Sequence, residues 1–247
     1  MEGAHQVAFS PMNRPVMILA AGLGTRMKPL TDVRPKPLIK VAGQTLLEHV
    51  LDRVEELSPS RIIINIHAHA RMMRSFLQEK ADSRIVISDE SDQLLDSGGG
   101  MAKAFGLHDE EDMLCLNGDI FWPRGASSSL SRLTLAHVQH DGPASLLLGA
   151  ASQGTGYDGQ GDFTLDQKGI IGKPVRAPKP FVFLGAQILP RAPFEGRVGE
   201  AFSVRDIWQP WLDEGVMHGL RHDGLWCHVG SPQAIEQAEK ALQFHGN

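Results

Sequence analysis

Short runs of β-branched and leucine residues alternate along the first half of the chain with segments in which apolar residues recur at helical spacing. The clearest helical pattern covers residues 43–57, GQTLLEHVLDRVEEL, where the apolar side chains return on one face and the charged side chains on the other. Such a face is expected to pack on a sheet. The apolar runs predict strands at residues 16–20, 61–66, 84–88 and 113–116.

Strands that are separated by such helices run parallel, because the crossover returns the chain to the same end of the sheet. The sequence therefore predicts an α/β fold, with a Rossmann-like mixed, mainly parallel sheet flanked by helices. After about residue 150 the chain becomes rich in glycine and proline, which predicts a small additional β layer. Helical signals return at residues 203–215 and 231–244, the second with Ser231 as a candidate cap and Pro232 at its first position.

The length of 247 residues suits one large domain with a sizeable core. We expect residues 1–14 to form a loose N-terminal extension and residues 15–247 a single domain. The net charge of −5 argues against a nucleic-acid partner, and the longest apolar runs are too short to span a membrane. Cys115 and Cys227 are expected to be buried apolar thiols in a reducing, cytoplasmic compartment.

The segment MILAAGLGTRMKPLTDVRPKPL, residues 17–38, contains the most distinctive chemistry. Met27 stands where a dinucleotide-binding motif has its third glycine, and no Gly-Lys-Ser/Thr follows, so neither that motif nor a P-loop is favoured. A glycine-rich turn can still bind phosphate through its backbone N–H groups. Residues 22–40 have a net charge of +4, and Pro35 and Pro37 restrict the backbone on both sides of Lys36. This pattern predicts a local site for a polyanion.

Two other groups of residues favour a structural interpretation. His67 and His69 follow a predicted strand at alternate positions and imitate a metal pair, but no third ligand is near them in sequence. Trp208 and Trp211 lie at near-helical spacing and are expected in the core.

Residues 19–37, LAAGLGTRMKPLTDVRPKP, resemble the signature of the sugar-1-phosphate nucleotidyltransferases, also called nucleotide-sugar pyrophosphorylases. Further similar stretches follow in order along nearly the whole chain: DSGGGMAKAF, LNGDI, GKPVRAPKPFVFLGAQIL and LWCHVGSPQAI. These enzymes join a nucleoside triphosphate to a sugar 1-phosphate and release pyrophosphate. The resemblance implies the nucleotide-diphospho-sugar transferase fold, with a nucleotide-binding half at about 15–125 and a sugar-binding half at about 126–247.

The resemblance also implies roles for individual residues. Arg26 and Lys36 would be catalytic, with Arg26 holding the leaving pyrophosphate and Lys36 between the α-phosphate and the attacking sugar phosphate. The sugar phosphate would be bound by Lys36, Asn117, Lys173 and Gly185. The nucleotide would be bound by Leu19, Ala20, Ala21, Gly22, Gly24, Thr25, Arg26, Ser97, Gly98 and Gly99, of which the last three would hold the base through backbone groups.

A metal site is implied at Asp119, whose carboxylate would hold Mg²⁺. His228 stands where many relatives have a second aspartate, and an imidazole can bind a divalent ion such as Mn²⁺ but favours metals softer than Mg²⁺. The alternative is that His228 contacts phosphate or a water and that Asp119 holds the metal largely alone. Gly172 likewise stands where many relatives have an acid, which leaves the recognition of sugar hydroxyls open.

Among family members, the compact length, the stretch SGGGMAKAF, the GDF at 161–163 and the strand FLGAQIL are most similar to those that use UTP and N-acetylmuramate 1-phosphate in cell-wall (peptidoglycan) recycling. Mannose 1-phosphate with GTP, or another hexose or heptose phosphate, is the alternative substrate pair. The alternative of another class is a catalytically silent sensor, which the residues Gly172 and His228 motivate and the presence of Arg26, Lys36 and Asp119 opposes. The chain lacks the β-helix of bifunctional relatives, so a single activity and a monomer are expected.

Overall fold

The computed structural model describes residues 14–173 and 178–245. Most of the predicted N-terminal extension, and residues 174–177 of the stretch GKPVRAPKPFVFLGAQIL, lie outside the described residues. None of the described helices is both long and apolar enough to cross a bilayer.

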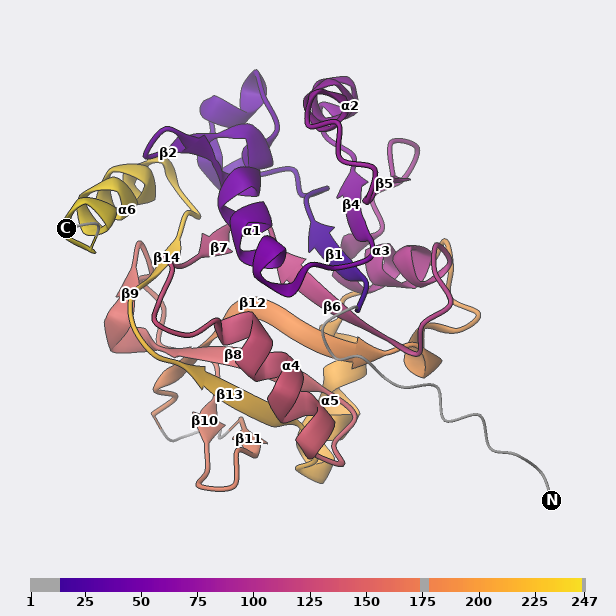
Figure 1. Ribbon diagram of the computed structural model, residues 1–247, viewed down its shortest axis with the longest axis vertical. Helices are drawn as coiled ribbons and strands as arrows, with labels where there is room; N and C mark the ends of the chain where they lie inside the picture. The colour runs from indigo at the N-terminus through magenta and orange to yellow at the C-terminus, as the bar shows by residue number, and fades with distance from the viewer. Residues whose placement is uncertain (1–13, 174–177, 246–247) are drawn as a thin grey trace.

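A seven-stranded sheet forms the centre of the molecule, in the order β13-β8-β12-β6-β1-β4-β5 (Figure 1). All neighbouring strands pair in parallel except β12, which is antiparallel to β6 and β8. The mixed, mainly parallel sheet is therefore confirmed, and the four strands predicted from apolar runs lie within one residue of those observed. The strands are β1 (Val16–Leu19), β4 (Ile62–Ile66), β5 (Ile85–Asp89), β6 (Asp112–Asn117), β8 (Ser145–Ala150), β12 (Phe181–Pro190) and β13 (His218–His222).

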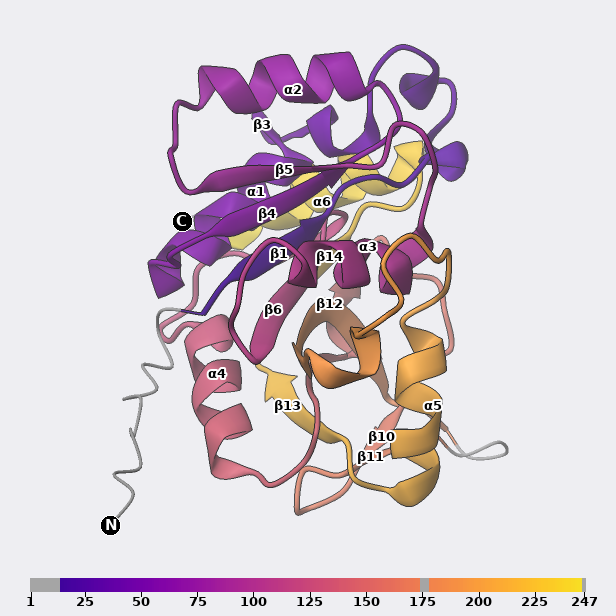
Figure 2. The same cartoon turned by 90° about the vertical axis from the view of Figure 1, so that its right-hand side faces the viewer.

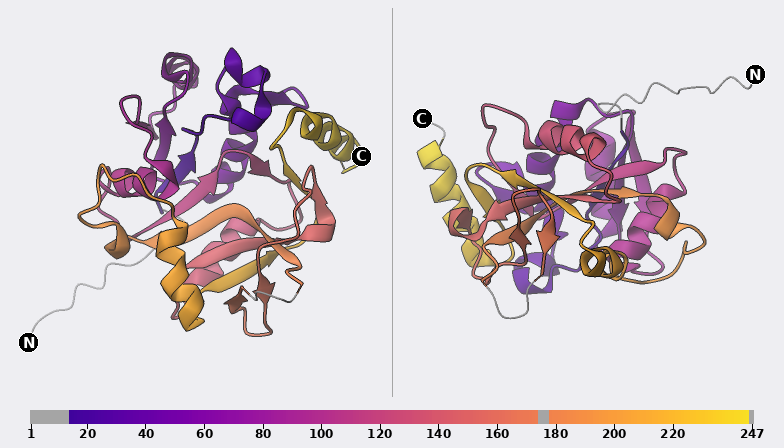
Figure 3. Two further views of the ribbon diagram at one scale, coloured as in Figure 1. Left: turned by 180° about the vertical axis from the view of Figure 1, so that it is seen from behind. Right: turned by 90° about the horizontal axis from the view of Figure 1, so that it is seen from below.

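Helices cover both faces of this sheet, because side chains along each strand point alternately to one face and the other. Ile62 and Ile64 pack in one core with α1 (Leu46–Val54), α2 (Ala70–Glu79) and α4 (Ser129–Gln139), whereas Ile63 packs in the other core with α3 (Asp96–Phe105) and α5 (Arg205–Glu214). Figure 2 shows α4 and α5 on opposite sides of β13, and Figure 3 shows α3 and α5 from behind.

The predicted helix at 43–57 is shorter in the structure. A two-stranded hairpin, β2 (Lys40–Val41) and β3 (Gln44–Thr45), precedes α1, and a 3₁₀ turn (Glu55–Leu57) follows it. The helix begins where it does because Thr45 and Glu48 form a capping box: the Glu48 N–H donates to Thr45 Oγ1 at 3.2 Å, and the Thr45 N–H donates to Glu48 Oε2 at 2.8 Å.

Short strands form the additional β layer that the sequence predicted. β7 (Ile120–Phe121), β14 (Trp226–His228) and β9 (Gly154–Thr155) make a three-stranded sheet, and β10 (Thr164–Leu165) pairs with β11 (Ile171–Gly172). The final helix α6 (Pro232–His245) packs against the three-stranded sheet through a core that contains Cys227. Cys115 and Cys227 are both fully buried and free, as predicted.

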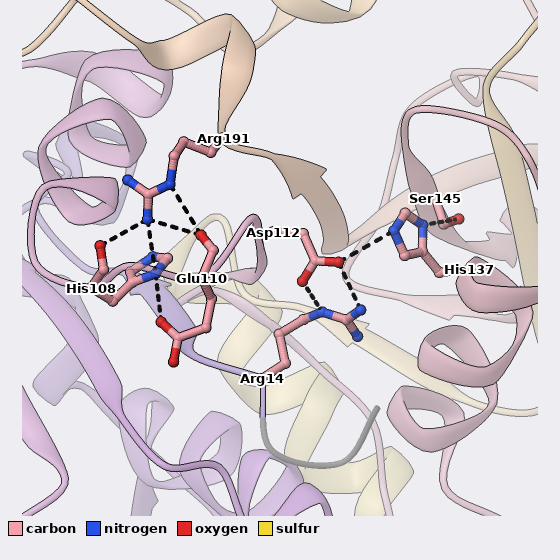
Figure 4. Close-up of polar contacts among 7 residues, drawn as sticks. All are labelled: Arg14, His108, Glu110, Asp112, His137, Ser145 and Arg191. Atoms are coloured by element: carbon pink, nitrogen blue, oxygen red, sulfur yellow. Dashed lines mark hydrogen bonds and ion pairs between the residues drawn. The ribbon is translucent and has the colours of Figure 1, made fainter. Parts of the chain in front are cut away.

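Ion pairs close the edge of the main sheet at which the parallel strands begin (Figure 4). The guanidinium of Arg14 pairs with Asp112, with Nη2 2.8 Å from Oδ2, while His137 Nδ1 lies 2.9 Å from Ser145 Oγ. Arg191, which follows the antiparallel β12, donates to three backbone carbonyl oxygens at the same edge, including that of Phe105. Arg14 is buried and so packs with the domain, although the sequence placed it in the extension.

Candidate active site

Two adjoining cavities lie where the parallel strands end, the edge at which open α/β sheets bind ligands. The first has a volume of about 550 Å³, and its walls come from the end of β4 and from the segments that follow β1, β5 and β6. We call it the first pocket. It is lined by Leu19, Ala20, Ala21, Gly22, Lys36, Pro37, Asn65, Glu90, Leu94, Asp96, Ser97, Asn117, Gly118 and Asp119.

The second pocket has a volume of about 400 Å³ and is walled by β12, by the segment 157–163 and by one face of α5. Ser97 and Asn117 line both cavities, so the two pockets meet at these side chains. Of the residues predicted at the sugar phosphate, Asn117 and Lys173 line the second pocket. A site with two communicating cavities can hold two substrates next to each other.

Lys36 and Asp119 meet in the first pocket. Lys36 Nζ lies 2.7 Å from Asp119 Oδ2, and the two side chains are 13% and 26% exposed. Burial alone would raise the pKa of Asp119, but the charge of Lys36, with smaller contributions from His228 and Arg26, holds it below its ordinary value. Asp119 is therefore a carboxylate at neutral pH.

The backbone around Lys36 is shaped by Gly24, whose φ is +62°. A Cβ at Gly24 would lie 3.0 Å from Lys36 Cβ and 2.9 Å from Thr31 Cγ2, so only glycine allows this approach. Pro35 and Pro37 are buried on both sides of the lysine. The stiff frame that the sequence predicted around Lys36 is present, while Gly24 shapes the loop without lining either pocket.

Arg26 lies outside the walls of both pockets, in the 3₁₀ turn Thr25–Met27, and is exposed. A Cβ at Gly230 would lie 3.5 Å from Arg26 Nη1 and 2.8 Å from His228 Cε1, which places both side chains around Gly230. Of the other residues in the glycine-rich segment that are predicted to bind the nucleotide, Thr25 does not line the first pocket. Those that do line it are Leu19, Ala20, Ala21 and Gly22.

His228 lies next to Asp119, because the Val229 N–H donates to the Asp119 carbonyl oxygen at 3.0 Å and His228 pairs with Ile120. Its Nδ1 is buried and has no hydrogen-bond partner among the described residues. Burial lowers the pKa of His228, and the charges of Lys36 and Arg26 lower it further against the opposing charge of Asp119. The neutral imidazole is therefore favoured at pH 7, and Nδ1 leaves a hydrogen-bonding capacity that no described residue uses. Within the described residues no group of three or more metal-binding side chains occurs.

The glycine run of DSGGGMAKAF lies inside α3, not in a loop ahead of it. The N–H groups of Gly98 and Gly99 both donate to the Phe202 carbonyl oxygen, at 2.8 and 3.2 Å, and a Cβ at Gly99 would lie 2.0 Å from the Glu200 carbonyl oxygen. These two N–H groups are therefore already bonded to the loop before α5, and the predicted contact of a base with backbone groups of Gly98 and Gly99 would have to use other backbone atoms. Ser97, which is predicted to bind the nucleotide, lines both pockets. Asp96 lines the first, and its φ of +59° is unusual for a residue with a side chain.

Gly185 acts on the site through Asn117. It lies in β12 with a φ of +77°, where the pairing with β8 shifts register, and a Cβ there would lie 2.7 Å from Asn117 Cβ. Gly185 lines neither pocket itself. Its absence of a side chain lets Asn117 occupy the place where the two pockets meet.

Asn65 and Glu90 are pocket residues that the sequence analysis missed. Both are only 2% exposed. Asn65 accepts the Ala20 N–H at 2.6 Å and donates to Glu90 Oε1 at 2.7 Å, and Glu90 Oε2 accepts the Leu95 N–H at 3.2 Å. The pair thus fixes the start of the glycine-rich segment to β4 and to the end of β5. The signal in the sequence was a polar residue within the apolar run IIINI.

The structural interpretation of the histidine pair is confirmed. His67 Nδ1 lies 2.6 Å from the Glu90 carbonyl oxygen, and His69 Nε2 lies 3.0 Å from the Thr31 carbonyl oxygen. Trp208 belongs to the core as predicted, but it also lines the second pocket and donates its indole N–H to Gln187 at 2.9 Å.

A mainly parallel sheet that ends in paired cavities, with a lysine and an aspartate in contact, is an arrangement suited to nucleotidyl transfer. Residues 16–153, more than half of the chain, match the model of the MobA-like NTP transferase domain, and the chain belongs to this family. It is a sugar-1-phosphate nucleotidyltransferase, and thus a transferase.

Two relatives are similar along almost their whole length. The chain is 35% identical over 232 residues to the N-acetylmuramate alpha-1-phosphate uridylyltransferase of Caulobacter vibrioides. The aligned region covers 92% of this chain and 96% of that protein. It is 29% identical over 229 residues to the enzyme of the same name from Neisseria meningitidis serogroup B, and this aligned region covers 90% of this chain and 96% of that protein.

Solved structures confirm the fold. The inositol-1-phosphate CTP transferase of T. maritima superposes with a TM-score of 0.74 at 16% identity, over 94% of this chain and 97% of that one. HddC from Yersinia pseudotuberculosis, in complex with GMP-PN, gives a TM-score of 0.73 at 20% identity, over 93% and 99%. The nucleotide-diphospho-sugar transferase fold is therefore the fold of this chain.

Proposed function

We propose that this protein transfers the uridylyl group of UTP to N-acetylmuramate 1-phosphate, giving UDP-N-acetylmuramate and pyrophosphate. The observation that carries the proposal is the 35% identity to the uridylyltransferase of Caulobacter vibrioides across nearly the full length of both chains. The second pocket, at about 400 Å³, supports it, because it offers room for a substituted sugar beside the nucleotide. The setting that we propose is cell-wall recycling in the cytoplasm.

In the proposed reaction a phosphate oxygen of the sugar 1-phosphate attacks the α-phosphorus of UTP. The new bond joins that oxygen to the α-phosphorus, and the bond from the α-phosphorus to the oxygen that bridges to the β-phosphorus breaks. Pyrophosphate leaves with the electron pair. Two anionic phosphates must come together, so positioning and charge neutralisation account for most of the catalysis.

We assign this neutralisation to Lys36 and Arg26. Lys36 lies in the first pocket on a rigid backbone, where its ammonium can hold both the α-phosphate and the attacking phosphate. Arg26 lies on the exposed side near Gly230, where its planar guanidinium suits the leaving pyrophosphate. Ala20, Ala21, Gly22 and Ser97 would line the bound nucleotide, and Asn117 and Lys173 the sugar phosphate.

The residues at the pocket fit a divalent cation, Mg²⁺ or Mn²⁺. Mg²⁺ in proteins is commonly held by one or two carboxylates together with substrate phosphates and waters. Asp119 supplies a carboxylate, and the unpartnered Nδ1 of His228 is the second candidate ligand. When bound, the cation would withdraw charge from the phosphate oxygens that it contacts.

The test is pyrophosphate release from a panel of triphosphates (UTP, GTP, CTP and dTTP) against a panel of sugar 1-phosphates, with Mg²⁺ or Mn²⁺. The proposal predicts the highest kcat/KM for UTP with N-acetylmuramate 1-phosphate. A preference for GTP with mannose 1-phosphate would replace the proposed substrates by the alternative pair. Tight nucleotide binding without turnover in any combination would instead indicate a sensor.

A further inference from the structure

The walls of the second pocket carry an excess of positive charge. Lys173, Lys179 and Arg205 line it from three different segments: after β11, before β12 and in the first turn of α5. Asp162 is the acidic side chain of these described walls, and its Oδ2 accepts the Phe183 N–H at 3.0 Å. Within residues 14–173 and 178–245, no carboxylate forms an ion pair with any of the three cations. Three cations thus face one carboxylate.

Arg205 is placed at the pocket by helix geometry. Arg205, Trp208, Gln209 and Leu212 all line the pocket, and their spacing puts them on one face of α5. Trp208 is 5% exposed and is held by its hydrogen bond to Gln187. The helix therefore presents Arg205, which is itself exposed, at the pocket beside the buried indole of Trp208.

Of these three cations we assign Lys173 to the sugar phosphate, and the phosphates of the two substrates do not account for Lys179 and Arg205. Lys36 and Asp119, which we assign to phosphate and metal, line the first pocket and not the second, while His228, the second candidate ligand, is neutral and lines the second. A neutral sugar requires hydrogen-bonding partners for its hydroxyls, which uncharged side chains can supply, and it does not require a net positive charge. The charge of the second pocket instead suits a sugar with a second anionic group.

We propose that the second pocket contains a carboxylate subsite in which Arg205 and Lys179 bind an acidic substituent of the sugar, separate from its 1-phosphate. The inference rests on the proposed function, because N-acetylmuramate differs from N-acetylglucosamine by a lactyl ether that ends in a carboxylate. A guanidinium binds a carboxylate through two parallel N–H donors, and such a charged pair changes affinity by about 10- to 100-fold. Arg205 and Lys179 are then specificity-determining residues.

The experiment compares kcat/KM for three substrates with UTP: N-acetylmuramate 1-phosphate, its lactyl carboxamide, and N-acetylglucosamine 1-phosphate. The carboxamide keeps the size of the substituent and removes its charge. For Arg205→Gln and for Lys179→Met we expect the ratio of acid to carboxamide to fall by about 10- to 100-fold relative to the wild type. Arg71→Gln is the matched control, an exposed arginine in the first turn of α2 outside both pockets, and should keep the wild-type ratio.

The outcomes separate this inference from the proposed function. A wild-type enzyme that prefers the acid, with both variants retaining the same ratio of acid to carboxamide, overturns the subsite and leaves the proposed function standing. A wild-type enzyme that prefers another carboxylated sugar 1-phosphate, with the preference lost in Arg205→Gln, supports the subsite and replaces the sugar. An equal loss of kcat/KM for all three substrates in both variants, with unchanged thermal unfolding, would mean that Arg205 and Lys179 bind a part that the three substrates share. This result overturns the inference.

Discussion

Replacing Lys36 by methionine should have opposite effects on metal binding and on turnover. The change keeps the length of the side chain and removes the ammonium that lies 2.7 Å from Asp119 Oδ2. In the structure the Lys36 ammonium is bonded to the Asp119 carboxylate, which we assign to the metal, so a metal ion that binds this carboxylate competes with the lysine. Without Lys36 the free enzyme should bind metal more tightly, whereas the reaction loses the charge that brings two phosphates together.

The size of each effect follows from the geometry. Both side chains are less than one-third exposed, so the contact is a partly buried, charge-assisted hydrogen bond with a contribution of about 2 kcal/mol. Its loss corresponds to an affinity for Mn²⁺ that is about 30-fold higher at most. Removal of a preorganised charge from the transition state lowers kcat on the order of 100-fold or more.

Electron paramagnetic resonance titration of the nucleotide-free enzyme with Mn²⁺ measures the first effect, and pyrophosphate release measures the second. Asp119→Asn should abolish the Mn²⁺ site in either background, and Lys40→Met, which changes an exposed lysine of the same segment, should match the wild type in both assays. Unchanged or weaker Mn²⁺ binding in Lys36→Met would refute competition at Asp119. Near-normal turnover would remove Lys36 from the chemistry.

Four further substitutions and one labelling measurement test other parts of the molecule. Gly99→Ala should lower the free energy of unfolding, measured in urea, by about 1–3 kcal/mol, because the added Cβ would meet the Glu200 carbonyl oxygen at 2.0 Å. Gly22→Ala, whose Cβ would have no heavy atom within 4 Å, should unfold like the wild type and raise the KM for UTP. Equal stability of the two variants would contradict the packing at Gly99. Asn65→Ala should lower the free energy of unfolding by about 2–4 kcal/mol, because the buried Ala20 N–H and the buried Glu90 carboxylate each lose a hydrogen-bond partner. A smaller loss would mean that water replaces the Asn65 amide. His228→Asp should raise the ratio of turnover with Mg²⁺ to turnover with Mn²⁺, and an unchanged ratio would exclude this side chain as a ligand. Burial raises the pKa of Cys227 to about 12, so a thiol reagent at pH 8 should label it no faster than the protein unfolds, and rapid labelling would contradict its burial.

The strands β1, β4 and β6 could be predicted from the sequence because their residues are mostly buried on both faces and read as apolar runs, which Asn65 interrupts in β4. The start of α1 was misplaced by a few residues, since the periodicity continues through the hairpin and only the Thr45–Glu48 capping box marks the boundary. The position of the glycines in α3 could not be predicted. Their conformation depends on Phe202, about a hundred residues away in sequence, and no local propensity reports such a contact.

The residues of the site were predictable where they follow a contiguous motif. Lys36, Asp119 and Asn117 were identified from their neighbours in sequence and do lie at the pockets. The partnership of Lys36 with Asp119 was not predicted, because it depends on how two loops meet at the edge of the sheet. Glu90 was missed for a related reason: an acidic residue after a strand suggests solvent, and only the packing of Asn65 and α3 around it makes it a buried acceptor.

The contact of α3 with Phe202 also determines when the site can form during synthesis. The family match ends at residue 153, and the strands β1, β4, β5 and β6 lie within it, so the floor of the first pocket is translated early. The N–H groups of Gly98 and Gly99 have their acceptor only after residue 202 has been added. A nascent chain that ends before residue 202 therefore lacks the acceptor of two N–H groups in the N-terminal part of α3. Because Asp96 and Ser97 line the first pocket from this turn of α3, the wall that they form gains its support from Phe202 only late in translation.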